Sequence, residues 1–239
     1  MLNFVPIPAF QDNYIWAIIN QETSDCVIID PGEANPVNQL LSANKLKLDS
    51  ILITHHHWDH TGGVVELAEH HKVKNVYGPH NPSIKGITVP LKEGDTIQIE
   101  CIKTKFQITE IPAHTLDHIA YINDEHIFCG DTLFSAGCGR LFEGSALQMF
   151  TALQKLTAGK NETKLYPAHE YTVANLKFAK TIDPNNQDII ERLNECETLI
   201  HQQKATLPTT IGVEKLTNPF VRAVDPEHLA VIRKQKDNF

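Results

Sequence analysis

The sequence predicts a mixed α/β fold that includes at least one largely antiparallel sheet and ends in a helical segment. Strand-like and helix-like runs interleave through the first two thirds of the 239 residues, which is typical of α/β proteins. From Leu147 to Leu156 apolar residues recur every third position, which is a helical spacing, and Ser145 is the expected N-cap. Beyond residue 170 the pattern is mainly helical. We therefore expect two domains, residues 1–170 and residues 171–239.

The chain begins with short strand patterns at residues 13–19 and 26–29, which are rich in β-branched or aromatic side chains. The turn sequence Asp-Pro-Gly at residues 30–32 closes the second of them. A short helix is expected at residues 38–43. The all-apolar run at residues 51–53 then predicts a buried strand.

Another helix face follows the glycine pair at residues 62–63, because Val64, Leu67 and Ala68 share one side of a helix. Strand patterns dominate residues 76–134. Alternation with polar residues predicts half-buried strands there, with apolar positions at Ile97, Ile99, Cys101, Phe106 and Ile108. A last strand at 164–167 precedes helices at 173–182 and 189–200, which a turn sequence at 183–186 separates.

Charge and hydropathy argue against several classes of function. The chain carries 21 basic and 29 acidic residues, a formal net charge of −8, which disfavours broad binding to nucleic acid or to an anionic membrane. No apolar stretch approaches the roughly 20 residues that span a bilayer. We expect neither a nucleic-acid partner nor a membrane partner, and we expect a monomer.

Two features predict a cytoplasmic protein. The first basic side chain is Lys45 and five acidic residues precede it, whereas secretory signals need a basic N-terminal region and transit peptides are rich in arginine. The five cysteines are scattered and form no CxxC pair, which indicates reduced thiols rather than a disulfide framework.

A cluster of histidines follows the predicted strand at residues 51–53. Imidazole and carboxylate groups are ligands of zinc and of its neighbouring metals. His55 and His57 are two positions apart, so in an extended loop their side chains project to one side and can converge on one ion. Asp59 and His60 are placed to reach a second ion. The alternative interpretation is a solvated polar loop.

Three later strand patterns each end at one candidate ligand in a turn of small residues. These ligands are His114, Asp131 and His169. Each alone is typical of an ordinary loop histidine or turn aspartate. Ligands at the same end of neighbouring strands, however, build a site on the rim of a sheet, so we expect them to join the first motif.

The order of these seven residues resembles the metallo-β-lactamase superfamily. Local strings narrow the resemblance to the hydroxyacylglutathione hydrolase (glyoxalase II) family, and it extends from about residue 3 to the last residue. The strings are Cys129-Gly130-Asp131-Thr132-Leu133-Phe134, Gly137-Cys138-Gly139-Arg140, His169-Glu170-Tyr171-Thr172 and Asn218-Pro219-Phe220.

This resemblance implies a four-layer αββα sandwich that holds two divalent metal ions, followed by a helical substrate-binding domain. By position, one ion would be held by His55, His57 and His114. The other would be held by Asp59, His60 and His169, and Asp131 would bridge the two. Zinc is the expected metal, and iron or manganese also suits a mixed imidazole and carboxylate ligand set.

The implied reaction is hydrolysis of the thiolester of S-(2-hydroxyacyl)glutathione, with S-D-lactoylglutathione giving D-lactate and glutathione in methylglyoxal degradation. A hydroxide between the metal ions would attack the carbonyl carbon, and Asp59 would orient it. The leaving thiol has a pKa near about 8.5, so it departs largely without a proton donor.

A glutathione conjugate carries two carboxylates, so an acidic chain needs local cations to bind it. Arg233 and Lys236 are three apart near the C-terminus and share one helix face. The resemblance places them on the glycine carboxylate of the tripeptide, with Tyr171 and Asn175 as hydrogen-bond partners. The alternative is a solvated helix end whose bases complement the helix dipole.

Two positions depart from the family pattern. Arg140 stands where the family often has lysine, which keeps the charge and changes its geometry, and we expect it to contact the substrate. Phe142 stands where some members have tyrosine, so a hydroxyl contact is lost there.

Other polar residues near these motifs have simpler expected roles. His56, between two ligands, should point away from the metals. His118 either supports a ligand or bonds the backbone at a strand start. Cys129 and Cys138 are expected to pack as small apolar residues, because a metal-activated water makes a cysteine nucleophile unnecessary.

Several other functions share parts of this pattern. The nearest is a mononuclear iron sulfur dioxygenase of the same superfamily. A lactonase or a β-lactamase comes next, although neither of these two is expected to have the basic helical tail. A nuclease is disfavoured by the net charge, and a flavin-linked diiron reductase needs a further domain. A metal-binding protein without catalytic activity would need no bridging carboxylate.

Overall fold

The computed structural model describes residues 1–239, and the backbone divides into two compact units. The N-terminal unit comprises Met1–Glu110 and Asp117–Asn123. The C-terminal unit comprises Ile111–Leu116 and Asp124–Phe239. No helix in either unit combines the length and the apolar character needed to cross a bilayer.

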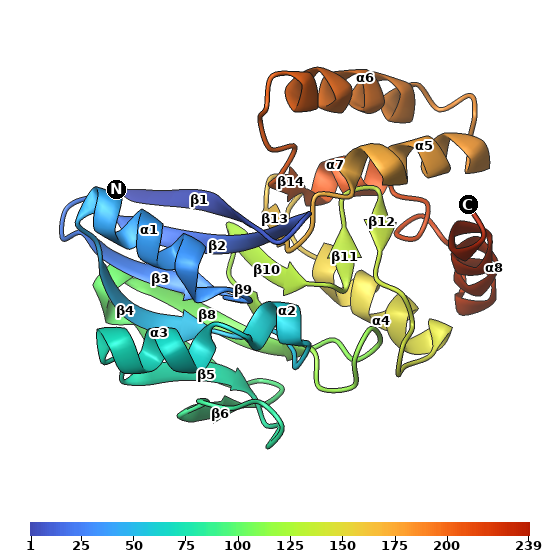
Figure 1. Ribbon diagram of the computed structural model, residues 1–239. Helices are drawn as coiled ribbons and strands as arrows, with labels where there is room; N and C mark the ends of the chain where they lie inside the picture. The colour runs from blue at the N-terminus through green and yellow to red at the C-terminus, as the bar shows by residue number, and fades with distance from the viewer. The chain divides into compact units, whose positions relative to one another are not determined.

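The N-terminal unit contains a six-stranded sheet in the order β1 to β6, and helices α1 and α3 lie along it (Figure 1). Pairing is antiparallel from β1 to β3 and parallel from β3 to β6. Its strands are β1 (Leu2–Ala9), β2 (Asn13–Asn20), β3 (Asp25–Ile29), β4 (Lys47–Leu52), β5 (Asn75–Pro79) and β6 (Val89–Leu91). Its helices are α1 (Ala34–Asn44), α2 (Trp58–Thr61) and α3 (Val64–His71).

The same unit holds three further strands, β7 (Thr96–Ile99), β8 (Thr104–Glu110) and β9 (Ile119–Ile122), which pair antiparallel. A 3₁₀ turn, η1 (Glu100–Ile102), joins the first two of them. These pairings confirm the predicted antiparallel component of the fold.

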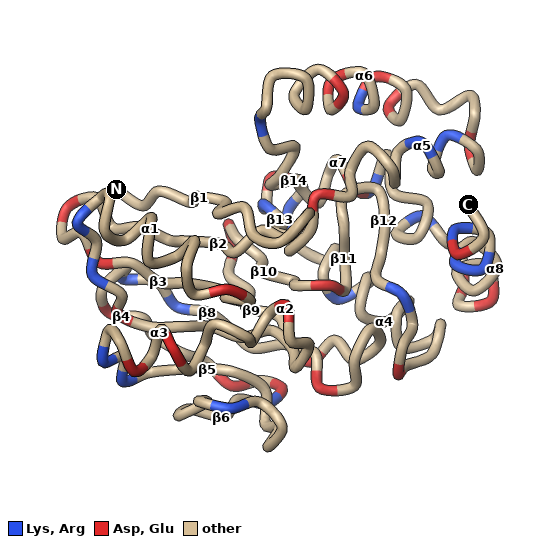
Figure 2. The backbone as a smooth tube through the Cα atoms, viewed as in Figure 1, with Lys and Arg blue, Asp and Glu red and all other residues tan.

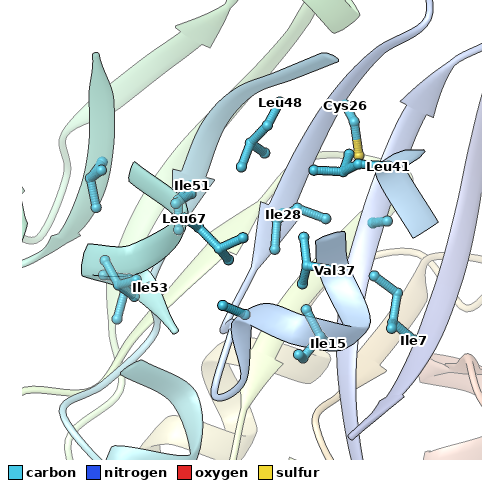
Figure 3. Packing of buried hydrophobic residues seen from close by; sticks show 14 of the residues in the cluster. Ile7, Ile15, Cys26, Ile28, Val37, Leu41, Leu48, Ile51, Ile53 and Leu67 are labelled. Carbon is cyan, nitrogen blue, oxygen red and sulfur yellow. The ribbon is translucent and has the colours of Figure 1, made fainter. Parts of the chain in front are cut away.

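The core of the N-terminal unit lies between the sheet and its helices (Figure 3). Val37 and Leu41 of α1 pack with Leu67 of α3 over the strand residues Ile28 and Ile51, and all five side chains are buried. Burial of one such side chain contributes about 1.5–3 kcal/mol. This packing therefore fixes the end of β4, from which the histidine loop departs.

Most predicted elements are confirmed, and the differences have local causes. Strand β1 was not predicted because Pro6 and Pro8 interrupt its pattern, but as an edge strand it tolerates residues without an N–H group. Helix α1 begins at Ala34, earlier than expected, because Pro36 falls in the first turn, where proline is accepted. Cys101 belongs to a 3₁₀ turn rather than to a strand.

The C-terminal unit pairs β10 (His126–Gly130) in parallel with β13 (Lys164–Pro167), and β13 antiparallel with β14 (Thr209–Thr210). A short hairpin joins β11 (Leu133–Phe134) and β12 (Gly137–Cys138). The helices of this unit are α4 (Ala146–Thr157), α5 (Thr172–Ile182), α6 (Gln187–His201), α7 (Ile211–Thr217) and α8 (Pro226–Asp237). Charges of both signs are interspersed along α6 and α8 (Figure 2).

The predicted helical character of the C-terminal segment is confirmed. Ser145 caps α4 as expected: its hydroxyl accepts from the Gln148 amide, and the Gln148 side chain accepts from the Ser145 N–H at 2.8 Å. Helices α5 and α6 pack through Leu176, Ile189 and Leu193. The break between them at residues 183–186 is a turn, as its sequence predicts.

Candidate metal centre

The histidine loop of the N-terminal unit gathers three imidazoles at the end of β4. Nε2 of His55 lies 3.2 Å from Nδ1 of His57, and the rings of His55 and His60 have centroids 4.1 Å apart. One turn of helix, α2, brings His60 back toward the two preceding histidines. The predicted convergence of His55 and His57 is thus present within this unit.

Asp59 joins the same group. Its Oδ2 atom lies 3.4 Å from Nε2 of His60 and accepts a hydrogen bond from Nδ2 of Asn13 at 3.0 Å. Asn13 is buried at the start of β2, so it orients the carboxylate from a rigid element. The Asp59 backbone lies so close to position 32 that only glycine fits there. A Cβ atom at Gly32 would lie only 1.9 Å from the Asp59 carbonyl oxygen.

Asp30 is a supporting residue that the sequence did not reveal. It is buried, with a φ of 53°, and its Oδ1 accepts the Thr54 backbone N–H at 2.7 Å. Its Oδ2 accepts both the Thr54 hydroxyl at 2.7 Å and Nδ1 of His60 at 3.2 Å. The Thr54 oxygen in turn lies 3.0 Å from Nδ1 of His55. One carboxylate therefore sets the proton position of two imidazoles, directly on His60 and through Thr54 on His55.

The two neighbouring histidines behave as the sequence suggested. His56 pairs through Nδ1 with Oδ1 of Asp117 at 2.8 Å, and Nδ2 of Asn81 donates to the other oxygen of that carboxylate. The ring of His118 stacks on His55 with centroids 4.5 Å apart, while its Nδ1 lies 3.2 Å from the Ile119 carbonyl oxygen. His118 thus contacts the backbone at the start of β9, and its ring packs on His55.

The C-terminal unit gathers the other three candidate ligands around one oxygen atom. Oδ2 of Asp131 lies 3.4 Å from Nε2 of His114 and 3.3 Å from Nε2 of His169. Asp131 follows β10 and His169 follows β13, and these two strands pair in parallel. Their carboxyl ends therefore meet at one edge of the sheet, which is the arrangement that the sequence predicted for these two residues.

The donor chemistry of both groups fits a metal ion. Nδ1 of His114 donates to the Arg140 carbonyl oxygen at 2.9 Å, so the lone pair of Nε2 is directed at Asp131. Because Nδ1 of His60 donates to Asp30, its Nε2 lone pair is directed at Asp59. A lone pair and a carboxylate oxygen repel each other unless a cation lies between them. A bound metal ion supplies that positive charge.

The two predicted substrate cations, Arg233 and Lys236, lie in different environments. Arg233 is buried: its Nη1 donates to the Cys138 carbonyl oxygen at 2.9 Å, and Nε and Nη2 both contact Asp237. Lys236 is half-buried, and Nζ donates to the Ala174 carbonyl oxygen at 3.3 Å. Burial, together with the charges of Arg233 and Arg140, lowers the pKa of Lys236 below its ordinary value.

The other predicted substrate residues also lie in the C-terminal unit. Tyr171 stacks on the imidazole of His169, with ring centroids 4.9 Å apart and nearly parallel planes. Asn175 is buried and its Nδ2 donates to the Ser135 carbonyl oxygen, so its amide already has a structural role. Arg140 is exposed, and its Nε lies 4.0 Å from Asp237.

The cysteines lack the character of nucleophiles. All five are thiols without disulfide partners, and Cys129 and Cys138 are fully enclosed. Burial raises the pKa of Cys138 to about 12, and burial likewise raises that of Cys129 far above its ordinary value. This agrees with their predicted role in packing.

Comparison with known proteins relates the whole chain to one family. Residues 12–169 match the model of the metallo-β-lactamase superfamily, and residues 170–239 match that of the hydroxyacylglutathione hydrolase C-terminus. A hydroxyacylglutathione hydrolase of Aliivibrio salmonicida is 49% identical, over 100% of this chain and 93% of its own length. That of Nitrosomonas eutropha is 48% identical, over 95% of this chain and 88% of its own length.

Solved structures show the same fold at lower identity. ETHE1 from Myxococcus xanthus superposes with a TM-score of 0.73 and 24% identity, covering 98% of this chain and 90% of its own. TTHA1623, solved in a di-iron-bound form, has a TM-score of 0.63 and 24% identity, covering 91% of this chain and 99% of its own. The expected metallo-β-lactamase fold is thus confirmed, and the chain belongs to the hydroxyacylglutathione hydrolase family, an enzyme family of the metallo-β-lactamase superfamily.

Proposed function

We propose that the protein hydrolyses the thiolester of S-(2-hydroxyacyl)glutathione, and that S-D-lactoylglutathione is its substrate. The products are D-lactate and glutathione. The observation that carries the proposal is that the chain matches hydroxyacylglutathione hydrolases through both segments, including the C-terminal one after residue 170. A lactonase or β-lactamase function would leave that segment unexplained.

We propose seven ligands for two metal ions. His55, His57 and His114 hold one ion, Asp59, His60 and His169 hold the other, and Asp131 bridges them. Support comes from the convergence of four of these residues within the N-terminal unit and of three within the C-terminal unit. The di-iron form of TTHA1623 supports two ions, while three imidazoles on one ion suit zinc, so zinc is proposed first and iron or manganese next.

When bound, such ions lower the pKa of a water molecule and polarise a carbonyl oxygen. Asp59 is the residue proposed to orient the nucleophile, because Asn13 holds its carboxylate in place. Tyr171 stacks on His169, and its hydroxyl is proposed to bond to the tripeptide. The leaving thiolate needs no proton donor at neutral pH, since a free thiol has a pKa near about 8.5.

The segment 171–239 is proposed as the substrate-binding domain and residues 1–170 as the catalytic domain. In the C-terminal unit Arg140 and Arg233 both pair with Asp237, and the charges of these two arginines act on Lys236. These three cations outnumber the one carboxylate, Asp237, so a substrate carboxylate would be attracted there. A cytoplasmic monomer without nucleic-acid or membrane partners is proposed from the composition.

One experiment tests the function: metal analysis combined with release of free thiol from S-D-lactoylglutathione. We expect about two ions per chain, loss of thiol release after treatment with a chelator, and recovery when Zn²⁺ is added back. One iron per chain with oxygen uptake on glutathione persulfide would instead support the dioxygenase. Bound metal without any thiolester cleavage would support a non-catalytic metal-binding protein.

Variants of the two basic residues should separate substrate binding from stability. Lys236→Ala is expected to raise KM roughly tenfold with little change in kcat or Tm, because a hydrogen bond to a charged group contributes about 1.5 kcal/mol. Arg233→Ala should raise KM and also lower Tm, by about 2–4 °C for each kcal/mol lost, because its buried bonds to Cys138 and Asp237 disappear.

Lys234→Ala is the matched control, since it removes the same charge from an exposed position of α8. An equal fall in kcat and rise in KM for Lys236→Ala would contradict its assignment to the substrate carboxylate.

A further inference from the structure

The hairpin of β11 and β12 connects the metal ligands of the C-terminal unit with its C-terminal helices. Asp131 precedes the hairpin by two residues, and the Gly139 N–H returns to the Thr132 carbonyl oxygen at 3.2 Å. A Cβ atom at Gly139 would lie 2.0 Å from the Asp131 carbonyl oxygen and 3.0 Å from Nδ1 of His114. The base of the hairpin is therefore packed directly on two of the proposed ligands.

The next residue extends this link. The Arg140 carbonyl oxygen accepts the Nδ1 proton of His114 at 2.9 Å. Asp131 thus leads into the hairpin, and the backbone partner of His114 directly follows it. A shift of the hairpin would therefore displace Asp131 and the backbone partner of His114.

The tip of the hairpin is held by one buried carboxylate. Glu214 of α7 is fully buried, and its Oε2 accepts the Ala136 N–H at 2.8 Å and Nδ2 of Asn218 at 2.9 Å. Its Oε1 accepts the Thr209 hydroxyl at 2.6 Å. Ala136 has a φ of 55°, a left-handed conformation that a residue with a Cβ atom rarely adopts without external support.

Asn218 and Asn175 also hold the tip of the hairpin. Nδ2 of Asn218 contacts the carbonyl oxygens of Phe134 and Gly137, at 3.1 and 2.9 Å, while Nδ2 of Asn175 donates to the Ser135 carbonyl oxygen at 3.0 Å. All of these donors and acceptors are buried, so each depends on the others for its partner. We call these four residues the clamp on residues 134–137: Asn175, Thr209, Glu214 and Asn218.

We infer that Glu214 is a positioning residue for metal binding, acting through the hairpin to place Asp131 and His114. The inference rests on the proposed metal site. It gives the C-terminal helices a second role besides substrate binding, because α7 and the residue that follows it then hold a hairpin about 80 residues earlier in the chain, and through it the ligands. Outer partners of metal ligands commonly affect affinity by about 10–100-fold when they are lost.

The test is a Zn²⁺ titration of metal-free protein in competition with a chromophoric chelator. Glu214→Ala is expected to weaken metal binding by about 10–100-fold. Glu214→Gln should stay close to the wild type, because its carbonyl oxygen can take the place of Oε2, and the Thr209 hydroxyl can rotate to accept from the new amide. Leu153→Ala, a buried truncation in α4, is the control for general destabilisation.

A second measurement uses the wild-type chain, so it remains decisive if Glu214→Ala does not fold. Coupling between two sites is reciprocal, so metal binding must in turn protect the hairpin tip. Amide hydrogen exchange at Ala136 should slow on addition of Zn²⁺ more than exchange in α4 does.

The outcomes are separable from those of the proposed function. A wild-type chain that binds no metal would overturn the metal site itself. A wild-type chain that binds metal while Glu214→Ala binds it equally well would overturn only the inference about Glu214. Metal-independent exchange at Ala136 would do the same, and so would an equal loss of affinity in Leu153→Ala.

Discussion

Asp131→Asn is expected to lower kcat for S-D-lactoylglutathione by about 10³-fold, because a metal-assisted reaction loses several kcal/mol of transition-state stabilisation with its ligand set. The bound metal should fall from about two ions per chain to one or none. Thiol release and elemental analysis of the same preparation measure both effects.

The physical reason lies in a single oxygen atom. Oδ2 of Asp131 lies 3.4 and 3.3 Å from the Nε2 atoms of His114 and His169, so it is the point at which the donors of the C-terminal unit meet. Asparagine keeps the shape of the side chain but removes the negative charge. Its amide N–H groups can also bond to the Nε2 lone pair of His114, which then cannot bind a metal.

Asp124→Asn is the matched control. It makes the same chemical change in the same unit, at an exposed carboxylate that forms only a 3.9 Å surface pair with Lys160. We expect metal content and kcat there to equal those of the wild type. Two bound ions and normal turnover in Asp131→Asn would exclude Asp131 as a ligand.

The sequence was sufficient to predict the residues whose position follows from a strand end. Asp131 and His169 each follow an apolar run, and the parallel pairing of β10 with β13 then brings them together. Spacing alone likewise placed His55 beside His57. In each case the local backbone decides where the side chain lies, so a local pattern is informative.

Residues whose role depends on distant contacts could not be predicted in this way. Asp30 reads as the first residue of an ordinary turn, yet its carboxylate meets Thr54 and His60, 24 and 30 residues further along the chain. Glu214 reads as one more acid on a helix, but it is buried against a hairpin 78 residues earlier. Arg233 was predicted from its charge, and charge does not reveal that its guanidinium is already bonded to Cys138 and Asp237.

Asp30→Asn is expected to weaken metal binding by about 10–100-fold, the usual effect of losing a partner that orients a metal ligand. In the first orientation of the new amide, its NH₂ group faces the Thr54 backbone N–H, a donor that cannot reverse. In the second, the NH₂ group faces Nδ1 of His60 and can bond to it only if the proton moves to Nε2. That atom is the proposed metal donor, so either orientation damages the site.

Thr54→Val separates the two branches of this network. Valine has the shape of threonine but removes the oxygen that lies between Asp30 and Nδ1 of His55, while the direct contact of Asp30 with His60 is kept. We therefore expect Thr54→Val to weaken only the ion on His55 and His57, and Asp30→Asn to weaken both. Stepwise titration of the metal-free variants with Co²⁺ distinguishes one affected site from two. Loss of both ions in Thr54→Val, or of neither in Asp30→Asn, would show that Asp30 does not set the proton positions of these two imidazoles.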